Sequence, residues 1–134
     1  MSTHPTPAMR SAPAWMSAVL WLAAVYNVLW AATTMAVPNL VFERIGMTPP
    51  SPIEFWLGIS ALVGVFGVGY GLAATAPYEH WAVVTIGLLS KLMGVVGMAV
   101  AIGKKTLPVE FGYLSVVNDA IWLLPFALIL RGAW

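Results

Sequence analysis

Four long apolar runs, separated by short polar links, dominate the pattern of hydrophobic and polar positions along the chain. A helix needs roughly 20 mainly apolar residues to cross the hydrocarbon core of a bilayer. The runs are continuous and do not alternate with polar residues, which favours helices over the strands of a membrane barrel. The pattern predicts membrane-spanning helices at about 13–37, 53–76, 81–103 and 111–130.

The first run follows Arg10 and therefore shares one feature with a secretory signal. Its apolar stretch is about twice as long as the core of a signal peptide, and no convincing cleavage site follows it. We therefore expect a retained first helix. The predicted organisation is an N-terminal tail over residues 1–12 and a single transmembrane domain over residues 13–134.

The link between the first two runs is the longest one. Residues 38–52 (PNLVFERIGMTPPSP) place an apolar cluster around Glu43 and Arg44, followed by three prolines. The cluster predicts a short helix lying in the membrane interface, and the prolines predict an extended approach to the second span. The other links are so short that neighbouring spans must run antiparallel. The predicted fold is an all-α, up-down four-helix bundle.

Composition leads to the same class of protein. Hydrophobic residues make up 60% of the 134 residues and charged residues only 8%, with a mean hydropathy of +0.88. About a quarter of the residues of a soluble domain are charged, so these few charges cannot coat a water-exposed surface. The chain is predicted to be an integral membrane protein with membrane lipids as partners. Basic residues are balanced between the two faces, which leaves the orientation open.

Charge and residue usage also exclude several kinds of partner and site. The net charge is +1 without a basic block, so no nucleic-acid partner is expected. The absence of cysteine excludes disulfides, thiolate metal sites and iron–sulfur clusters. The two histidines, His4 in the tail and His80 in a short link, do not form a paired ligand set for haem or copper. We expect no metal and no cofactor.

Small residues crowd the second and third spans at four-residue intervals, a spacing that permits close backbone approach and predicts tight helix packing. The run from Gly64 to Gly71 resembles a nucleotide-binding glycine pattern only superficially, because it lies within an apolar span and not at a strand-to-helix turn. The three small-residue pairs are Ser60/Gly64, Gly67/Gly71 and Ser90/Gly94.

Two charged residues interrupt the apolar runs at matching depth. Lys91 lies roughly 15 Å into the third span and Asp119 roughly 17 Å from the end of the fourth, at 1.5 Å per helical residue. An unpaired charge at this depth costs at least about 3 kcal/mol on insertion scales, and each charge can offset the cost of the other. The sequence therefore predicts a buried Lys91–Asp119 ion pair.

Further polar and aromatic side chains are placed to join this pair. Two interpretations stay open: the cluster either fixes the rotation of the helices or lines a ligand pocket. If it lines a pocket, we expect a small lipid-accessible cavity that reaches Asp119 or Asn118, with the first span standing off from the fourth. Glu54 either caps the second span or lines this cavity. The candidate pocket residues are Lys91, Asp119, Asn118, Trp122, Asn27, Glu54 and Tyr26.

Several stretches together resemble a known group of proteins. The segments "YNVLWA", "HWAVVTIGLLSKLMG" and "VNDAIWLLPF" are similar to small bacterial four-helix membrane proteins related to the DoxX-like families, over roughly residues 20–130. The resemblance implies a four-helix fold in the bacterial inner (cytoplasmic) membrane. The broader family name implies association with quinone-linked respiratory complexes, although the sequence holds no redox ligand.

A second, structural analogy is to the EXPERA-type sterol isomerases and lipid-binding proteins. Their bundles hold acidic, Asn, His and Trp side chains in a cavity within the membrane. By this analogy alone, similar roles in a cavity would fall to Glu54, Asn118, Asp119 and Trp122.

Three classes of function follow from these observations. The first is a non-enzymatic membrane protein that binds a lipid or a quinone-like hydrophobic molecule, or that serves as a homo-oligomer or an accessory subunit of a membrane complex. The second is an intramembrane isomerase that uses Asp119 or Glu54 for acid–base chemistry on a hydrophobic substrate. The third is a small proton-coupled transporter that uses Lys91 and Asp119. The transporter ranks last because the two halves of the chain show no repeat.

Overall fold

The computed structural model describes residues 10–134, and four of its helices are long and apolar enough to cross a membrane. These helices span Ala14–Ala36, Glu54–Thr75, Trp81–Gly103 and Glu110–Ala133. They confirm the predicted all-α four-helix fold of an integral membrane protein. The fourth helix runs three residues past its predicted end, since Arg131 in its last turn can extend its charged head toward water. Residues 1–9 of the predicted tail lie outside the described part.

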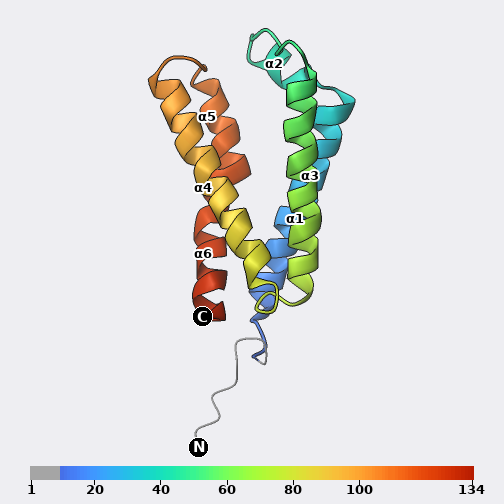
Figure 1. Cartoon of the computed structure of the whole chain (residues 1–134), viewed down its shortest axis with the longest axis vertical. Coiled ribbons are helices and arrows are strands. Elements are labelled where there is room, and N and C mark those ends of the chain that lie inside the picture. Colours follow the sequence, from blue (N-terminus) through green and yellow to red (C-terminus); the bar gives the residue numbers. More distant parts are fainter. Residues whose placement is uncertain (1–9) are drawn as a thin grey trace, which may run out of the picture.

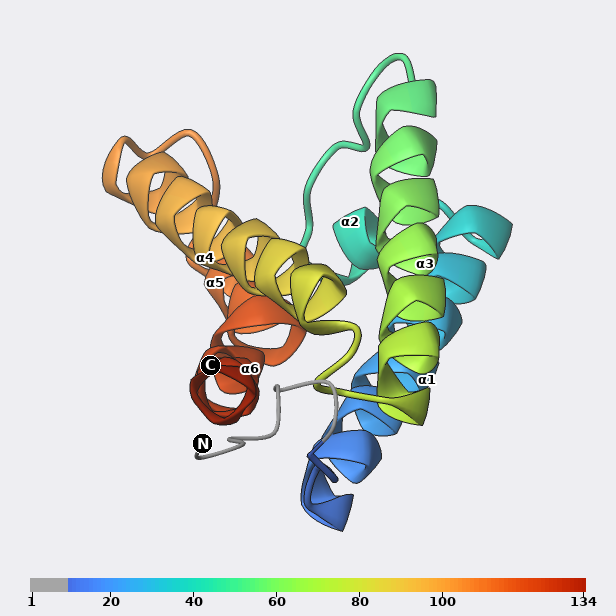
Figure 2. The same ribbon diagram turned by 60° about the horizontal axis from the view of Figure 1, so that its bottom comes forward.

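The four spans form two closely packed pairs (Figure 1). Helix α1 (Ala14–Ala36) packs along α3 (Glu54–Thr75), and α4 (Trp81–Gly103) packs along the fourth span. The pairs meet near the short α3–α4 link and diverge toward the other end, which gives the molecule the outline of a V in both views (Figures 1 and 2).

Glycines let the α1–α3 pair approach closely, as the small-residue spacing predicts. A Cβ atom added at Gly67 would lie 3.0 Å from the Ala24 carbonyl oxygen and 3.0 Å from the Asn27 Cβ atom. One added at Gly64 would lie 3.0 Å from the Ala31 Cβ atom. Any larger residue at Gly67 would therefore push against backbone, which has little freedom to move.

The glycines of α4 serve a different purpose, because side chains rather than backbone occupy the space beside them. A Cβ at Gly87 would lie 2.5 Å from a ring carbon of Tyr70, and one at Gly94 would lie 2.5 Å from the Asp119 Oδ2 atom. Gly87, Lys91 and Gly94 follow at four- and three-residue steps and so share one face of α4. That face accommodates a large aromatic ring and a carboxylate.

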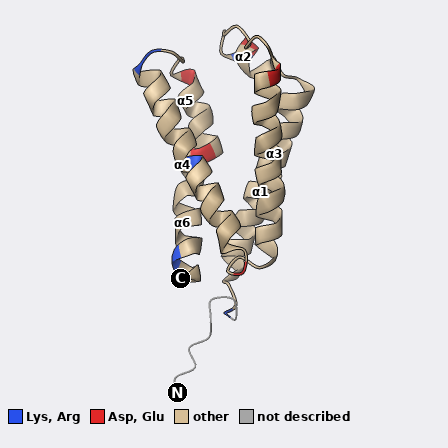
Figure 3. Cartoon of the chain, viewed as in Figure 1, with Lys and Arg blue, Asp and Glu red and all other residues tan. Residues whose placement is uncertain are grey.

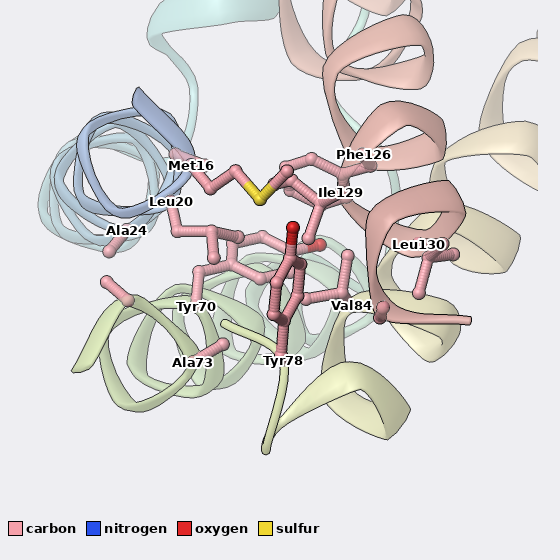
Figure 4. Close-up of a cluster of buried hydrophobic side chains, with 13 residues drawn as sticks. Met16, Leu20, Ala24, Tyr70, Ala73, Tyr78, Val84, Phe126, Ile129 and Leu130 are labelled. Carbon is pink, nitrogen blue, oxygen red and sulfur yellow. The ribbon is translucent and has the colours of Figure 1, made fainter. Parts of the chain in front are cut away.

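A hydrophobic core joins the two pairs near the α3–α4 link (Figure 4). Tyr70 of α3 and Phe126 of the fourth span are both fully buried there, with their ring centroids 5.1 Å apart in an edge-to-face arrangement. Leu20 of α1 and Ile129 complete the contact between the pairs. This core holds the closed end of the V together.

The first link contains the predicted short helix, α2 (Leu40–Arg44), which lies near the open end of the V (Figure 1). Its Phe42 is 3% exposed and packs between Trp56 of α3 and Phe111 of the fourth span, with centroid distances of 4.8 and 6.0 Å. A Schellman turn ends α2, with Gly46 at φ +70° and the Met47 N–H donating to the Phe42 carbonyl. Phe42 therefore bridges the two pairs at the open end, while the position of α2 in a membrane interface stays a prediction.

Candidate functional site

The fourth span is not a uniform α-helix, and its irregular turn carries the key polar residues. It consists of α5 (Glu110–Ser115), a π-helical turn η2 (Val116–Ala120) and α6 (Ile121–Ala133). The Ile121 N–H bonds to the Val116 carbonyl, five residues back. Pro125 lies inside α6 and has no N–H to donate to the carbonyl of Ile121. One backbone hydrogen bond of a regular α-helix is therefore missing just after the π-turn. Single π-turns of this kind often occur at functional sites.

The wide turn allows backbone carbonyls to accept hydrogen bonds from side chains. The Trp122 Nε1 donates to the Val117 carbonyl at 3.1 Å, and the Lys91 Nζ donates to the Asn118 carbonyl at 2.7 Å. Lys91 comes from α4, so the second bond also ties α4 to the fourth span. Both carbonyls of this turn therefore accept hydrogen bonds from side chains.

Lys91 is buried at 3% exposure in the middle of the bundle. Its Nζ lies 4.0 Å from the Asp119 Oδ1, and three aromatic ring centroids lie 5.5 to 6.0 Å away, those of Tyr70, Trp122 and Phe126. The predicted contact between Lys91 and Asp119 is confirmed, although the nearest partner of the ammonium group is the backbone carbonyl of Asn118. Figure 3 shows this acidic and basic pair halfway along the helices, whereas other charged positions gather near the helix ends.

The Asn118 side chain connects the fourth span to the first. The Tyr26 hydroxyl of α1 donates a hydrogen bond to the Asn118 Oδ1, and the Tyr26 ring centroid lies 6.1 Å from that of Trp122. The first and fourth spans are therefore in contact at this level, while the cavity described next is lined by residues of both. The Tyr26 hydroxyl and the Asn118 amide oxygen pair with each other, and such a pair favours contact between the two helices in an apolar environment.

A cavity of about 210 Å³ lies between the two helix pairs, beside the polar cluster. All four spans contribute to it, and Asp119, Asn118 and Lys91 form a polar part of its wall. Aromatic and aliphatic side chains line most of the remainder. The lining residues are Asn27, Trp30, Trp56, Ile59, Val63, Phe66, Tyr70, Ser90, Lys91, Gly94, Met98, Phe111, Leu114, Ser115, Asn118 and Asp119.

The candidate residues from the sequence divide into three groups. Lys91, Asp119, Asn118 and Asn27 line the cavity, as the pocket interpretation requires. Tyr26 and Trp122 do not line it but hold the lining residues in place from behind. Glu54 does neither: it is exposed in the first turn of α3, where a carboxylate is favoured by the helix dipole.

Several residues of the site escape sequence reasoning. Trp56 lines the cavity although its position near the end of a span is typical of an interfacial aromatic belt. Ser60, a polar residue of the second span, is not among the lining residues and donates to the Trp56 carbonyl within its own helix. The π-turn also escapes prediction, and the one signal for it is a polar Asn–Asp pair followed six residues later by a proline inside an apolar run.

The arrangement can bind a polar group but offers few groups for chemistry. Within residues 10–134, no three His, Asp or Glu side chains come together in a way that could hold a metal ion. The Lys91 ammonium and the Asp119 carboxylate supply a donor and an acceptor at one place in an otherwise apolar wall. Such a wall with a few polar groups is typical of a small-molecule site.

The chain matches no protein-family model, and neither the curated proteins nor the solved structures include one with significant similarity to it. The fold and the cavity therefore carry the functional argument.

Proposed function

We propose that this protein binds a lipid- or quinone-like hydrophobic molecule in the cavity between its two helix pairs, as a stand-alone binder or as an accessory subunit of a membrane complex. We further propose that it is a DoxX-like protein of the bacterial inner membrane. The observation that carries the proposal is the cavity itself, because it reaches the Lys91–Asp119 pair at mid-membrane.

The placement of the polar groups supports binding over a purely structural role. A cluster that only fixed the rotation of the helices would be complete when its members satisfied one another and packed without a void. Here Asp119 retains 24% side-chain exposure and lines the cavity together with Lys91. A buried ion pair that borders a cavity is better explained as part of a site.

The apolar part of the cavity suits a hydrophobic ligand. Met98, Phe111 and Leu114 lie on its wall, and the two helix pairs diverge on that side of the polar cluster (Figure 1). A ligand that placed its polar end near Asp119 could extend its apolar part along this wall. In such sites the apolar wall provides affinity, and the few polar groups fix the orientation of the ligand.

Filling the cavity tests the proposal. Met98→Trp adds bulk to the cavity wall, whereas Val96→Trp adds the same side chain to the exposed face of the same helix, where Val96 is 54% exposed. We expect lipid extraction and mass spectrometry to find a ligand that co-purifies with the wild-type chain and with Val96→Trp, and that is lost from Met98→Trp. Equal ligand content in all three proteins would contradict the proposal.

A further inference from the structure

Four polar side chains on the cavity wall belong to residues that are more than nine-tenths buried. Asn27, Tyr70, Trp56 and Ser115 are 4, 1, 8 and 8% exposed. Their side-chain nitrogen and oxygen atoms take part in none of the side-chain hydrogen bonds within residues 10–134. The Trp56 Nε1 in particular is a fully buried donor without an acceptor in this part of the chain.

Unpaired polar groups within a bilayer are costly, because the surrounding lipid offers no hydrogen bonds. These groups come from α1, α3 and α5 and line one cavity, but Trp56 and Tyr70 lie about 21 Å apart along α3, so one small polar group can satisfy only some of them at once. The cavity of about 210 Å³ is partly open, so it can hold a small head group while the rest of a lipid extends outside it.

The charges on the wall select the charge of that head group. The Lys91 Nζ and the Asp119 Oδ1 lie 4.0 Å apart, the two charges balance each other, and no other Asp, Glu, Lys or Arg within residues 10–134 lines the cavity. An anionic head group would therefore leave one uncompensated negative charge at mid-membrane, and a cationic one an uncompensated positive charge. Both are expensive in a low-dielectric environment, so a neutral head group is favoured.

The hydrogen-bonding capacity of the wall adds a second requirement. An ionised carboxylate only accepts hydrogen bonds, and the Asp119 carboxylate receives none from residues 10–134. The indole Nε1 of Trp56 only donates. The occupant must therefore bring a donor for Asp119 and an acceptor for Trp56, which a hydroxyl group and an ester or hydroxyl oxygen provide.

From these observations we infer that the ligand is a neutral lipid whose head group carries hydroxyl donors, such as a glycerol ester or an alkylhydroquinone. This inference rests on the proposed function and narrows its ligand class. It excludes anionic lipids such as fatty acids, as well as neutral lipids that only accept hydrogen bonds.

Three compounds that share one acyl chain test the head group alone. They are 1-monooleoylglycerol, which is neutral with hydroxyl donors, methyl oleate, which is neutral without donors, and oleate, which is anionic. We expect native mass spectrometry of the full chain in detergent micelles to show binding of monooleoylglycerol at least roughly tenfold tighter than that of the other two, as expected for hydrogen bonds to a charged group. The same comparison is made between an alkylhydroquinone, which has hydroxyl donors, and its quinone, which has none. Whichever of monooleoylglycerol and the alkylhydroquinone binds more tightly shows whether the ligand is a glycerol ester or a hydroquinone.

The Asp119→Asn variant predicts a change of selectivity that loss of structure would not produce. It leaves the Lys91 charge uncompensated, so affinity for oleate should rise while affinity for monooleoylglycerol falls. Trp56→Phe keeps an aromatic ring but removes the donor, and should weaken monooleoylglycerol binding several-fold without any gain for oleate. The preference of the wild-type chain tests the inference even where a variant fails to fold.

The Met98→Trp variant separates failure of this inference from failure of the proposed function. If Met98→Trp abolishes binding but oleate or methyl oleate binds the wild-type chain as tightly as monooleoylglycerol, the cavity is a lipid site and the head-group inference is wrong. If no compound binds, or if binding survives in Met98→Trp, both proposals fail. A cavity that holds only water would bind none of the compounds.

Discussion

The two helix pairs use glycine and polar residues in opposite ways. In the α1–α3 pair, glycines such as Gly67 bring two backbones together, and apolar contacts fill the interface. In the other pair, Gly94 of α4 accommodates the Asp119 carboxylate, and a π-turn exposes carbonyls to side chains. The first pair is packed for rigidity, whereas the second holds a polar site at a depth where such groups are costly.

The comparison shows that a small residue in a membrane helix has no single meaning. A four-residue spacing of small residues predicts close packing in both pairs, and only the α1–α3 pair uses it for backbone contact. What differs is the partner: an apolar helix can approach a glycine directly, while a helix with a buried carboxylate fills the same space with that side chain. Three substitutions test this contrast.

The largest effect is expected from removing one charge of the Lys91–Asp119 pair. Asp119→Asn leaves Lys91 without its counter-charge and should cost about 3–5 kcal/mol of unfolding free energy, as is typical when one member of a buried ion pair is removed. The double variant with Lys91→Met should be clearly more stable than Asp119→Asn. A double-mutant cycle of denaturation in mixed micelles measures this coupling, and additive losses would mean that the two charges do not interact.

A smaller effect is expected from overpacking the apolar pair. Gly67→Ala places a methyl group against the backbone of Ala24 and should cost about 1–3 kcal/mol. Gly97→Ala is the matched control, because a Cβ at Gly97 meets no atom within 4 Å. The same denaturation assay should find Gly97→Ala at least as stable as the wild-type chain. Equal losses at the two sites would contradict the close approach of α1 and α3.

The smallest effect is expected at the hydrogen bond that links the two pairs. Tyr26→Phe removes the donor to Asn118 but keeps the ring that packs near Trp122, so the expected loss is only about 0.6–1 kcal/mol. Tyr113→Phe, at a side chain that is 70% exposed, should change stability by less. If the two variants lose equal stability, Tyr26 does not connect the pairs.

Much of the fold can be predicted from the sequence because membrane spans depend on local composition. The runs that predict the spans need no knowledge of the partner helices, and the depth of Lys91 and Asp119 follows from counting residues. The short helix at Leu40–Arg44 follows from its apolar cluster in the same way. These features are properties of single segments.

The site is less predictable because it depends on how the helices rotate and bend. The π-turn changes which residues of the fourth span face inward, and no local pattern fixes its register. The bond from Tyr26 to Asn118 joins residues 92 positions apart, and the contribution of Trp56 depends on how α3 faces α5. Glu54 illustrates the converse. Its charge suggests a site residue, but its position in the first turn of α3 accounts for a carboxylate there through the helix dipole, without any role in a site.

Site-resolved photolabelling in membranes tests the central claim, that a hydrophobic ligand occupies the cavity between the two pairs. A monoacylglycerol with a diazirine near its head group would be photolysed with the full chain, and labelled peptides would be mapped by mass spectrometry. We expect labels on cavity residues such as Ser90, Met98 and Leu114, and their loss in Met98→Trp. Labels confined to lipid-facing residues such as Leu92 and Val96, unchanged in Met98→Trp, would contradict the claim.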